Sequence, residues 1–159
     1  MRILVAYASK TGGTKGLAEM LGGDLREMGH DVDVVPAVDV RDVGFYQAVI
    51  VGGALYIFRW HRDARRFVKR FRVALRERPV WLFSSGPLDD SARTKDIPPV
   101  RFVRKAVTMV GAKGHATFGG RLTEAARGNN KALAVGDWSD PEHVREWAES
   151  IAKELAEAS

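Results

Sequence analysis

Short apolar runs alternate with longer amphipathic stretches about five times along the chain. The runs at 2–8, 48–52 and 80–83 are almost continuously apolar and are bounded by glycine, proline or hydroxyl residues, which is typical of buried strands. Two shorter runs of the same kind complete a set of five predicted strands, at 31–35 and 114–118. Between them, apolar residues at helical spacing predict four helices, at 15–28, 61–76 and 100–110 and from Ser139–Glu142 to the end of the chain, where Ser139 and Glu142 match a capping box.

Apolar strands separated by amphipathic helices indicate a parallel sheet that is covered on both faces. Right-handed crossovers then give a doubly wound α/β sandwich. The length of 159 residues suits one domain spanning 1–159. We therefore expect a three-layer fold with its ligand site at the carboxyl ends of the strands.

The composition excludes several kinds of functional site. The chain contains no cysteine, which excludes disulfides, thiolate nucleophiles and zinc sites with sulfur ligands. Apolar residues make up 45% and charged residues 28%, with no apolar run long enough to span a bilayer. The start of the chain enters a strand directly and lacks the features of a secretory signal, so we expect a cytoplasmic protein.

Positive charge is concentrated in one segment. The chain has 25 Lys and Arg against 20 Asp and Glu, and residues 59–78 alone hold nine basic and two acidic residues. In the predicted helix, the basic residues lie largely away from the apolar stripe; they are Arg62, Arg65, Arg66, Lys69, Arg70, Arg72 and Arg76. This segment, Arg62–Arg76, is either a solvated face or a docking surface for an anionic membrane or an acidic partner or substrate. Without a recognisable nucleic-acid module, we expect no nucleic-acid partner.

Three loops follow the predicted strand ends and have a distinctive composition. Ser9-Lys10-Thr11-Gly12-Gly13-Thr14 combines hydroxyls, glycines and a following helix, which suits an anion such as a phosphate monoester. It matches neither the Walker pattern nor the dinucleotide fingerprint, and the alternative is a plain turn with a capping residue. The loop at 54–60 is rich in large aromatics, which could stack on a flat ring or simply cover the sheet edge. The loop at 84–98 begins Ser84-Ser85-Gly86-Pro87, whose small residues would let the backbone approach a ligand or form an ordinary turn.

The motif Ser9-x-Thr11-Gly12-x-Thr14 resembles the phosphate loop of flavodoxins, which runs Thr/Ser-x-Thr-Gly-x-Thr. Within the flavodoxin-like superfamily, the chain is most similar to the flavodoxin-domain proteins that include menaquinone-dependent protoporphyrinogen oxidase. The similar segments are 5–12, 53–56, 62–70, 81–87, 118–122 and 136–138. The resemblance implies a five-stranded parallel sheet of order 2-1-3-4-5.

The resemblance also implies FMN as the cofactor, with the redox chemistry belonging to the flavin and no separate catalytic residue. The phosphate would be held by Ser9, Lys10, Thr11, Gly12, Gly13 and Thr14. Ala54, Leu55 and Tyr56 would flank one side of the flavin ring, and Ser84, Ser85, Gly86 and Pro87 the other. The implied activity is oxidation of a porphyrinogen, in heme biosynthesis, with a quinone as acceptor, at the inner face of a membrane.

Two alternatives remain open at this point. One is a soluble flavodoxin-type electron carrier without a small-molecule substrate, although such carriers are generally acidic and residues 59–78 are basic. The other is a flavodoxin fold that binds a partner and no flavin. The stretch 123–134 is shorter than in the porphyrinogen-oxidising relatives, which bears on the oxidase activity and leaves the flavin site unaffected.

Other candidate sites are weaker. The histidines His30, His61, His115 and His143 form no close pair, so we expect no metal site. His61 and His115 come near predicted strand ends, where they could contact a ligand or serve as surface or capping residues. Asp89 and Asp90 could bind a cation or belong to a solvated loop.

Overall fold

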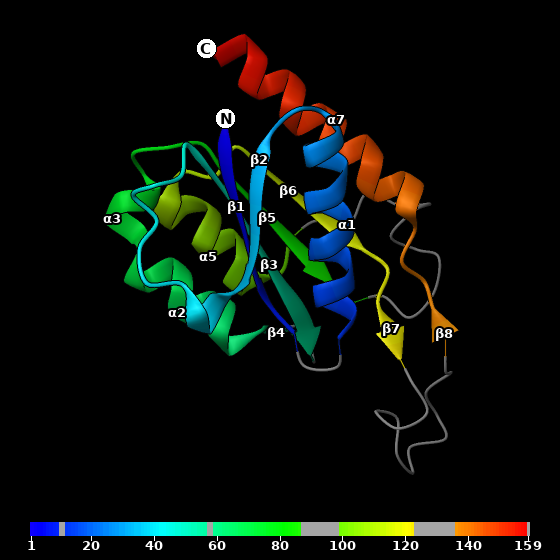
Figure 1. Cartoon of the computed structure of the whole chain (residues 1–159). Helices are drawn as coiled ribbons and strands as arrows, with labels where there is room; N and C mark the ends of the chain where they lie inside the picture. The colour runs from blue at the N-terminus through cyan, green and yellow to red at the C-terminus, as the bar shows by residue number, and fades with distance from the viewer. Residues whose placement is uncertain (10–11, 57–58, 87–98, 123–135, 159) are drawn as a thin grey trace.

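The computed structural model describes residues 1–9, 12–56, 59–86, 99–122 and 136–158. Its centre is a sheet of five parallel strands, in the order β2-β1-β3-β5-β6. These strands are β1 (Arg2–Ala8), β2 (Asp31–Pro36), β3 (Ala48–Tyr56), β5 (Val80–Ser85) and β6 (Gly114–Phe118). Numbered along the chain as parallel strands only, this is the expected order 2-1-3-4-5, and the predicted fold class is confirmed (Figure 1).

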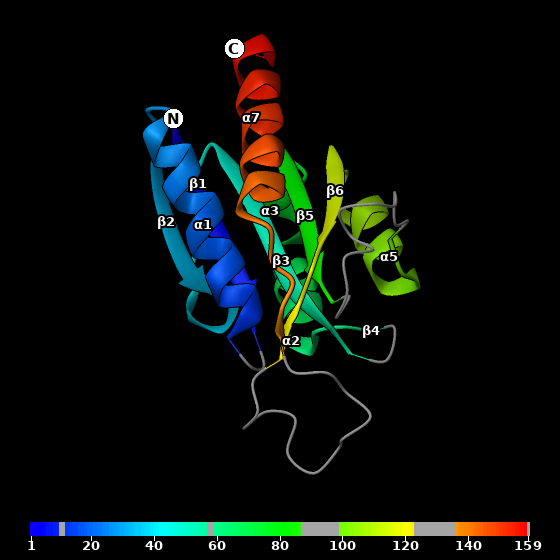
Figure 2. The same ribbon diagram turned by 90° about the vertical axis from the view of Figure 1, so that its right-hand side faces the viewer.

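Helices cover both faces of the sheet. One face carries α1 (Gly13–Glu27) and α7 (Pro141–Ala158), and the other carries α2 (Arg62–Arg70), α3 (Arg72–Leu75) and α5 (Arg101–Val110). Figure 2 shows α1 and α7 in front of the sheet, with α2 and α3 behind it. A short 3₁₀ helix, η1 (Ala37–Asp39), follows β2 and lies against α2.

Alternate residues of the central strands supply two separate cores, as the side-chain period of two requires. Leu4, Val49 and Leu82 point toward α2, α3 and α5. Ile3, Ile50 and Phe83 point toward α1 and α7. All six side chains are fully buried, which explains why these strands are almost continuously apolar.

The loop predicted at 54–60 is largely a hairpin, which corrects the expectation of an aromatic loop. β3 continues to Tyr56, and the short strand β4 (Arg59–Trp60) pairs with it antiparallel. Trp60 is fully buried, and its indole N–H donates to the Phe83 carbonyl at 3.2 Å. The aromatic composition of this segment therefore serves the core at Trp60, whereas Tyr56 is exposed.

Three further expectations are corrected at element ends. Ser84 and Ser85 belong to β5, because β3 runs far enough to pair with both of them. The basic helix is interrupted at Phe71, which separates α2 from α3. The last helix is capped by Asp140, whose side chain accepts from the Glu142 amide at 3.0 Å. Ser139, the predicted cap, instead donates its hydroxyl proton to Asp137.

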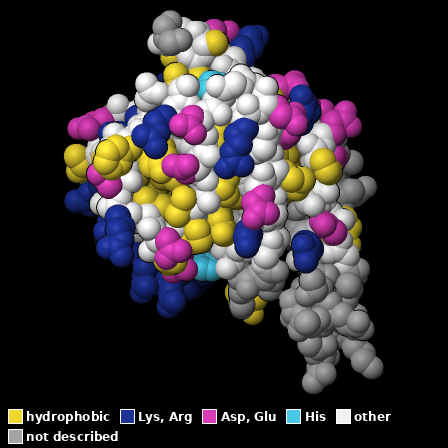
Figure 3. Space-filling view, viewed as in Figure 1, with side chains coloured by type: hydrophobic (Ala, Val, Ile, Leu, Met, Phe, Trp, Pro, Cys, Tyr) yellow, Lys and Arg dark blue, Asp and Glu magenta, His cyan; other side chains and the backbone are white. Residues whose placement is uncertain are grey.

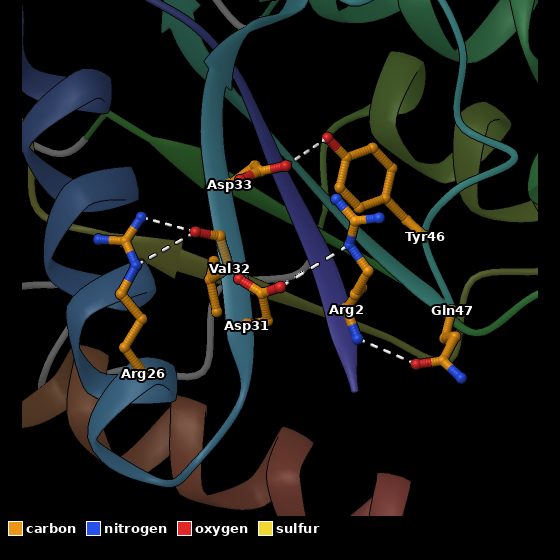
Figure 4. A network of polar contacts seen from close by, with 7 residues as sticks. All are labelled: Arg2, Arg26, Asp31, Val32, Asp33, Tyr46 and Gln47. Carbon is orange, nitrogen blue, oxygen red and sulfur yellow. Dashed lines mark hydrogen bonds and ion pairs between the residues drawn. The ribbon is translucent and has the colours of Figure 1, made fainter.

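Polar contacts hold the edge strand β2 against its neighbours (Figure 4). Arg26 of α1 donates two hydrogen bonds to the Val32 carbonyl, and the Tyr46 hydroxyl donates to Asp33 at 2.7 Å. Burial and the bond to Asp33 raise the pKa of Tyr46 to about 12. Arg2 forms an ion pair with Asp31, at 3.8 Å.

A second, two-stranded sheet joins β7 (Arg121–Leu122) to β8 (Gly136–Asp137). The short segment at 123–134 and the candidate cation pair Asp89–Asp90 lie outside the described residues. Among the helices of the described ranges, none is long and apolar enough to cross a membrane.

Candidate functional site

The loop after β1 leads directly into the amino end of α1. Gly12 adopts a left-handed conformation with φ of 90°, which favours glycine, and its amide donates to the Ser9 hydroxyl at 2.9 Å. The first amides of a helix have no acceptor within the helix, so those at the start of α1 are free to face an anion. The first turn of α1 contains no acidic residue. The loop is therefore electrostatically suited to a phosphate group.

Thr14 anchors this loop to the sheet. Its side chain is buried, and its Oγ1 lies 2.6 Å from the Oγ of Ser85 at the end of β5. This bond joins two of the three predicted loops across a sequence separation of 71 residues. The bond therefore fixes the start of α1 against the end of β5.

Arg121 is a site residue that the sequence analysis did not single out. A Cβ built at Gly13 would lie 3.4 Å from both the Cβ and the amide nitrogen of Arg121. The backbone of β7 thus passes directly over the start of α1, and a Cβ at position 13 would be in ordinary van der Waals contact with it. The signal in the sequence was a cation three residues beyond the end of β6, but only the fold shows that this position meets the loop after β1.

The second and third predicted loops meet at the same edge of the sheet. A Cβ at Gly86 would lie 3.0 Å from the Cβ of Leu55, so the ends of β3 and β5 are in direct contact. Ala54 pairs with Ser85 in the ladder, and Tyr56 projects into solvent with 62% of its surface exposed. Leu55 and Gly86 therefore form one continuous rim next to the loop between β1 and α1, which we call the phosphate loop.

Ser84 and Ser85 support this rim from within the sheet. Ser85 bonds Thr14 on the α1 side, whereas the Oγ of Ser84 lies 3.1 Å from Nε2 of His115 on the other side. Burial lowers the pKa of His115 to about 4, so its imidazole is neutral at neutral pH. His115 thus serves the sheet, and His61 caps α2 by accepting from the Asp63 amide at 3.0 Å.

A hollow of about 310 Å³ opens on the β2 side of the phosphate loop. Its lining is largely apolar and includes one lysine and one aspartate. The lining residues are Tyr7, Ala8, Ser9, Gly12, Lys15, Pro36, Val38 and Asp63. The hollow leaves space beside Ser9 and Gly12, the two residues that shape the loop.

Ten of the thirteen predicted site residues lie in the described part of the chain; Lys10, Thr11 and Pro87 lie outside it. The ten meet at the carboxyl ends of β1, β3 and β5. The hydroxyls and amides at the start of α1 suit the phosphate of FMN. The apolar residues at the ends of β3 and β5 suit its ring. In the described ranges, no three His, Asp or Glu residues lie close enough to hold a metal ion.

Comparisons with known proteins agree with this geometry. The model of the flavodoxin domain family matches residues 4–128. Among curated proteins, protoporphyrinogen IX dehydrogenase [quinone] from Escherichia coli K12 is 24% identical over 86 residues, which cover 53% of this chain and 48% of that protein. The chain thus spans about half the length of the curated relatives it matches.

Solved structures extend the likeness to the whole fold. A flavodoxin from the domain Archaea has a TM-score of 0.68 at 18% identity, over 98% of this chain and 99% of that one. Flavodoxin 2 from Bacillus cereus has a TM-score of 0.66 at 19% identity, over 97% and 99%. Rubredoxin oxygen:oxidoreductase from Desulfovibrio gigas has a TM-score of 0.65 at 15% identity, over 98% of this chain and 36% of that one. With a family model matching most of its length, this chain belongs to the flavodoxin domain family.

Proposed function

We propose that the chain binds FMN noncovalently at the carboxyl edge of its parallel sheet and works as a flavin-dependent oxidoreductase. The observation that carries this proposal is the hydrogen bond between Ser9 and the left-handed Gly12 at the start of α1, together with the Thr14–Ser85 bond that ties α1 to β5. Proteins of the flavodoxin family bind a flavin, typically FMN.

Each part of the site has a role toward such a cofactor. The Ser9 hydroxyl and the first amides of α1 would bind the phosphate, with Arg121 adding positive charge nearby. Leu55, Tyr56 and Gly86 would lie along the ring, where small and apolar groups exclude water from one side. The bound FMN supplies the electron-transfer chemistry, and the protein supplies position and electrostatics.

The finer proposal is oxidation of a porphyrinogen with a quinone as acceptor, a step of heme biosynthesis carried out on the cytoplasmic side of a membrane. It is supported by the similarity to protoporphyrinogen IX dehydrogenase, which is 24% identical over 86 residues. The basic residues of α2 and α3 would then face a substrate with carboxylates or an anionic membrane surface.

A soluble electron carrier is the second candidate. It is supported by the agreement with single flavodoxins over nearly the full length of both chains, whereas only half of the dehydrogenase is matched. Redox titration separates the two candidates. A carrier is expected to show two separated one-electron potentials, and a dehydrogenase one two-electron potential together with porphyrinogen-dependent quinone reduction.

The test of the proposed function is a titration of the flavin-free protein with FMN and, in parallel, with riboflavin, which lacks the phosphate. We expect saturable quenching of flavin fluorescence, with FMN bound at least about a hundredfold more tightly than riboflavin because of the phosphate loop. A protein that leaves the fluorescence of both flavins unchanged would contradict the proposal.

A further inference from the structure

The layer formed by α2, α3 and α5 carries a large unbalanced charge. Together these helices contain nine basic side chains and one acidic side chain. α5 contributes Arg101, Arg104 and Lys105, which are exposed and extend the charge beyond the segment that the sequence analysis recognised. Figure 3 shows Lys and Arg gathered at the lower left, beside α2, whereas Asp and Glu are frequent at the upper right, near α1 and α7. We call the α2–α3–α5 layer the basic face.

Few acidic side chains among the described residues pair with the basic face. In the described part of the chain, the only ion pair made by a basic side chain of these helices joins Arg62 to Asp63, at 4.0 Å. Arg66, Lys69 and Arg104 are exposed and form no ion pair with a described residue. Crowded like charges lower the stability of the folded state. A partner with the opposite charge would relieve this cost.

Next to the proposed flavin site, arginines of the basic face and of β4 gather around one aromatic ring. Two guanidinium groups lie over the ring of Phe102, at 4.7 Å for Arg65 and 5.8 Å for Arg59. Arg65 also donates its Nε proton to the Trp60 carbonyl at 3.0 Å. β4 pairs with the carboxyl end of β3, and Phe102 lies in the first turn of α5, so this cluster stands beside the rim residue Leu55.

We propose that the basic face docks an acidic electron-transfer protein, with Arg59 and Arg65 held ready at the flavin edge to receive its carboxylates. The proposal rests on the proposed flavin binding, since it names the partner class of that same site. Arginine presents a planar fork that pairs with a carboxylate through two hydrogen bonds, and a fork already fixed by a ring and a carbonyl loses less entropy on binding.

The structure favours a protein over a membrane as the occupant. Membrane attraction needs only diffuse charge, usually with apolar side chains that enter the lipid. The helices of the basic face expose one large apolar side chain among their described residues, Val73, and the exposed Tyr56 stands apart from it beside Arg59. A second copy of this chain is a poorer fit, because two basic faces repel each other and contact with the acidic face is head-to-tail, which cannot give a closed dimer.

A docked iron–sulfur protein would be a one-electron donor, and bound FMN would be the acceptor. Two docking events would supply the two electrons of full FMN reduction, each cluster being oxidised by one electron, with the protons taken from water. The proximity of Arg59 and Arg65 to the rim keeps this transfer path short.

Binding is tested first, on the flavin-free protein, so that its result does not depend on FMN. A small acidic ferredoxin is titrated into the chain at about 20 mM and about 300 mM ionic strength. We expect saturable binding that weakens at least about tenfold at the higher salt. Lys69→Glu on α2 should weaken binding about fivefold or more. Lys153→Glu, the same exposed substitution on α7, should leave it within about twofold.

Electron transfer is tested next, on the FMN-loaded protein in a stopped-flow instrument with reduced ferredoxin. Arg59→Gln removes one charge of the cluster without touching the core, and we expect it to slow flavin reduction by ferredoxin about fivefold or more. Reduction by dithionite, which needs no docking, should remain unchanged.

The outcomes separate the two proposals. If FMN does not bind, the proposed function fails, whatever the ferredoxin titration shows. If FMN binds but Lys69→Glu and Lys153→Glu have equal effects on ferredoxin binding, the docking proposal fails alone. Binding to vesicles containing phosphatidylglycerol, lost in Lys69→Glu, without salt-dependent binding of ferredoxin would also overturn it and assign the basic face to a membrane.

Discussion

The helix layers on the two faces of the sheet bury similar apolar cores but carry opposite net charge. Both bury an apolar stripe on five parallel strands, and both cores are well filled. The α2–α3–α5 layer has nine basic side chains and one acidic side chain, whereas α1 and α7 together have four basic and eight acidic ones. Core packing therefore does not account for the difference.

In the acidic layer, one arginine pairs with several carboxylates and joins the two helices. Arg145 of α7 contacts Glu27 at 2.9 Å, Asp24 at 3.6 Å and Glu149 at 3.4 Å, and so links α7 to α1. Burial raises the pKa of Asp24, and the guanidinium of Arg145 opposes this effect. In the described part of the basic layer, Arg76 donates to the Thr108 and Met109 carbonyls of α5, and no ion pair joins two of its helices. The comparison indicates that the described α1–α7 layer joins its helices through ion pairs, whereas the described α2–α3–α5 layer joins them through contacts of arginines with a ring and with carbonyls.

The largest expected effect comes from two adjacent glycines that point to opposite faces. A Cβ at Gly52 would overlap the Phe83 ring on the α1–α7 side, and a Cβ at Gly53 would lie 2.5 Å from the Trp60 indole nitrogen on the α2 side. We expect Gly52→Ala to lower the free energy of unfolding by about 3 kcal/mol or more, and Gly53→Ala by about 2 kcal/mol, in urea denaturation.

Gly23→Ala is the control for the glycine pair. Position 23 lies within α1, with no atom within 4 Å of a built Cβ. Here alanine should stabilise the protein, by up to about 1 kcal/mol, because it restricts the unfolded chain and favours the helix. If Gly52→Ala were as stable as the original protein, the packing assigned to the two cores would be wrong.

Much of the fold could be predicted from the sequence, because buried parallel strands leave a plain apolar signal. The strand at Gly114–Phe118 was predicted with its observed bounds, and the first strand likewise. The β3–β4 hairpin was missed because Trp60 reads as a loop aromatic until its bond to the Phe83 carbonyl is seen. The break at Phe71 was missed because the apolar spacing continues through it.

The site was predictable only in part, for a similar reason. The loop after β1 carries its signal in consecutive residues, whereas the Thr14–Ser85 bond and the approach of Arg121 to Gly13 depend on distant segments. Likewise, α5 extends the basic face through Arg104 and Lys105, which are unremarkable in the sequence. Contacts between elements of this kind require the three-dimensional structure.

Protonation of one partly buried histidine on the α2–α5 side of the sheet should lower the stability of the protein in acid. His115 pairs with Leu82 in the ladder and points with it toward the α2–α5 face. Burial lowers its pKa to about 4 from 6.5, so the neutral imidazole stabilises the fold above about pH 6.5, and this contribution is lost as the pH falls toward 4.

The measurement is urea denaturation across this pH range for the original protein and His115→Gln. Between pH 6.5 and 4, we expect the original protein to lose up to about 3 kcal/mol relative to the variant. Parallel pH profiles for the two proteins would show that His115 is not held neutral by the fold.

The smallest expected effects concern exposed charges, and they differ in sign between the faces. Arg145→Gln should lower the urea midpoint slightly, because it removes the contacts with Glu27 and Asp24. Arg66→Gln should leave stability unchanged or raise it by up to about 0.5 kcal/mol, because it relieves repulsion. Added salt should reduce both effects. Equal losses from the two substitutions would contradict the contrast between the layers.

The central claim is that the loop after β1 holds the phosphate of FMN, and Gly13 offers the most direct test. Gly13→Asp places a carboxylate at the first position of α1, where it favours the helix but repels a phosphate, and Gly13→Asn has the same shape without the charge. Both are titrated with FMN and with riboflavin. We predict that Gly13→Asp weakens FMN about a hundredfold relative to Gly13→Asn, with equal affinity of the two variants for riboflavin. Equal affinity of the two variants for FMN would contradict the claim.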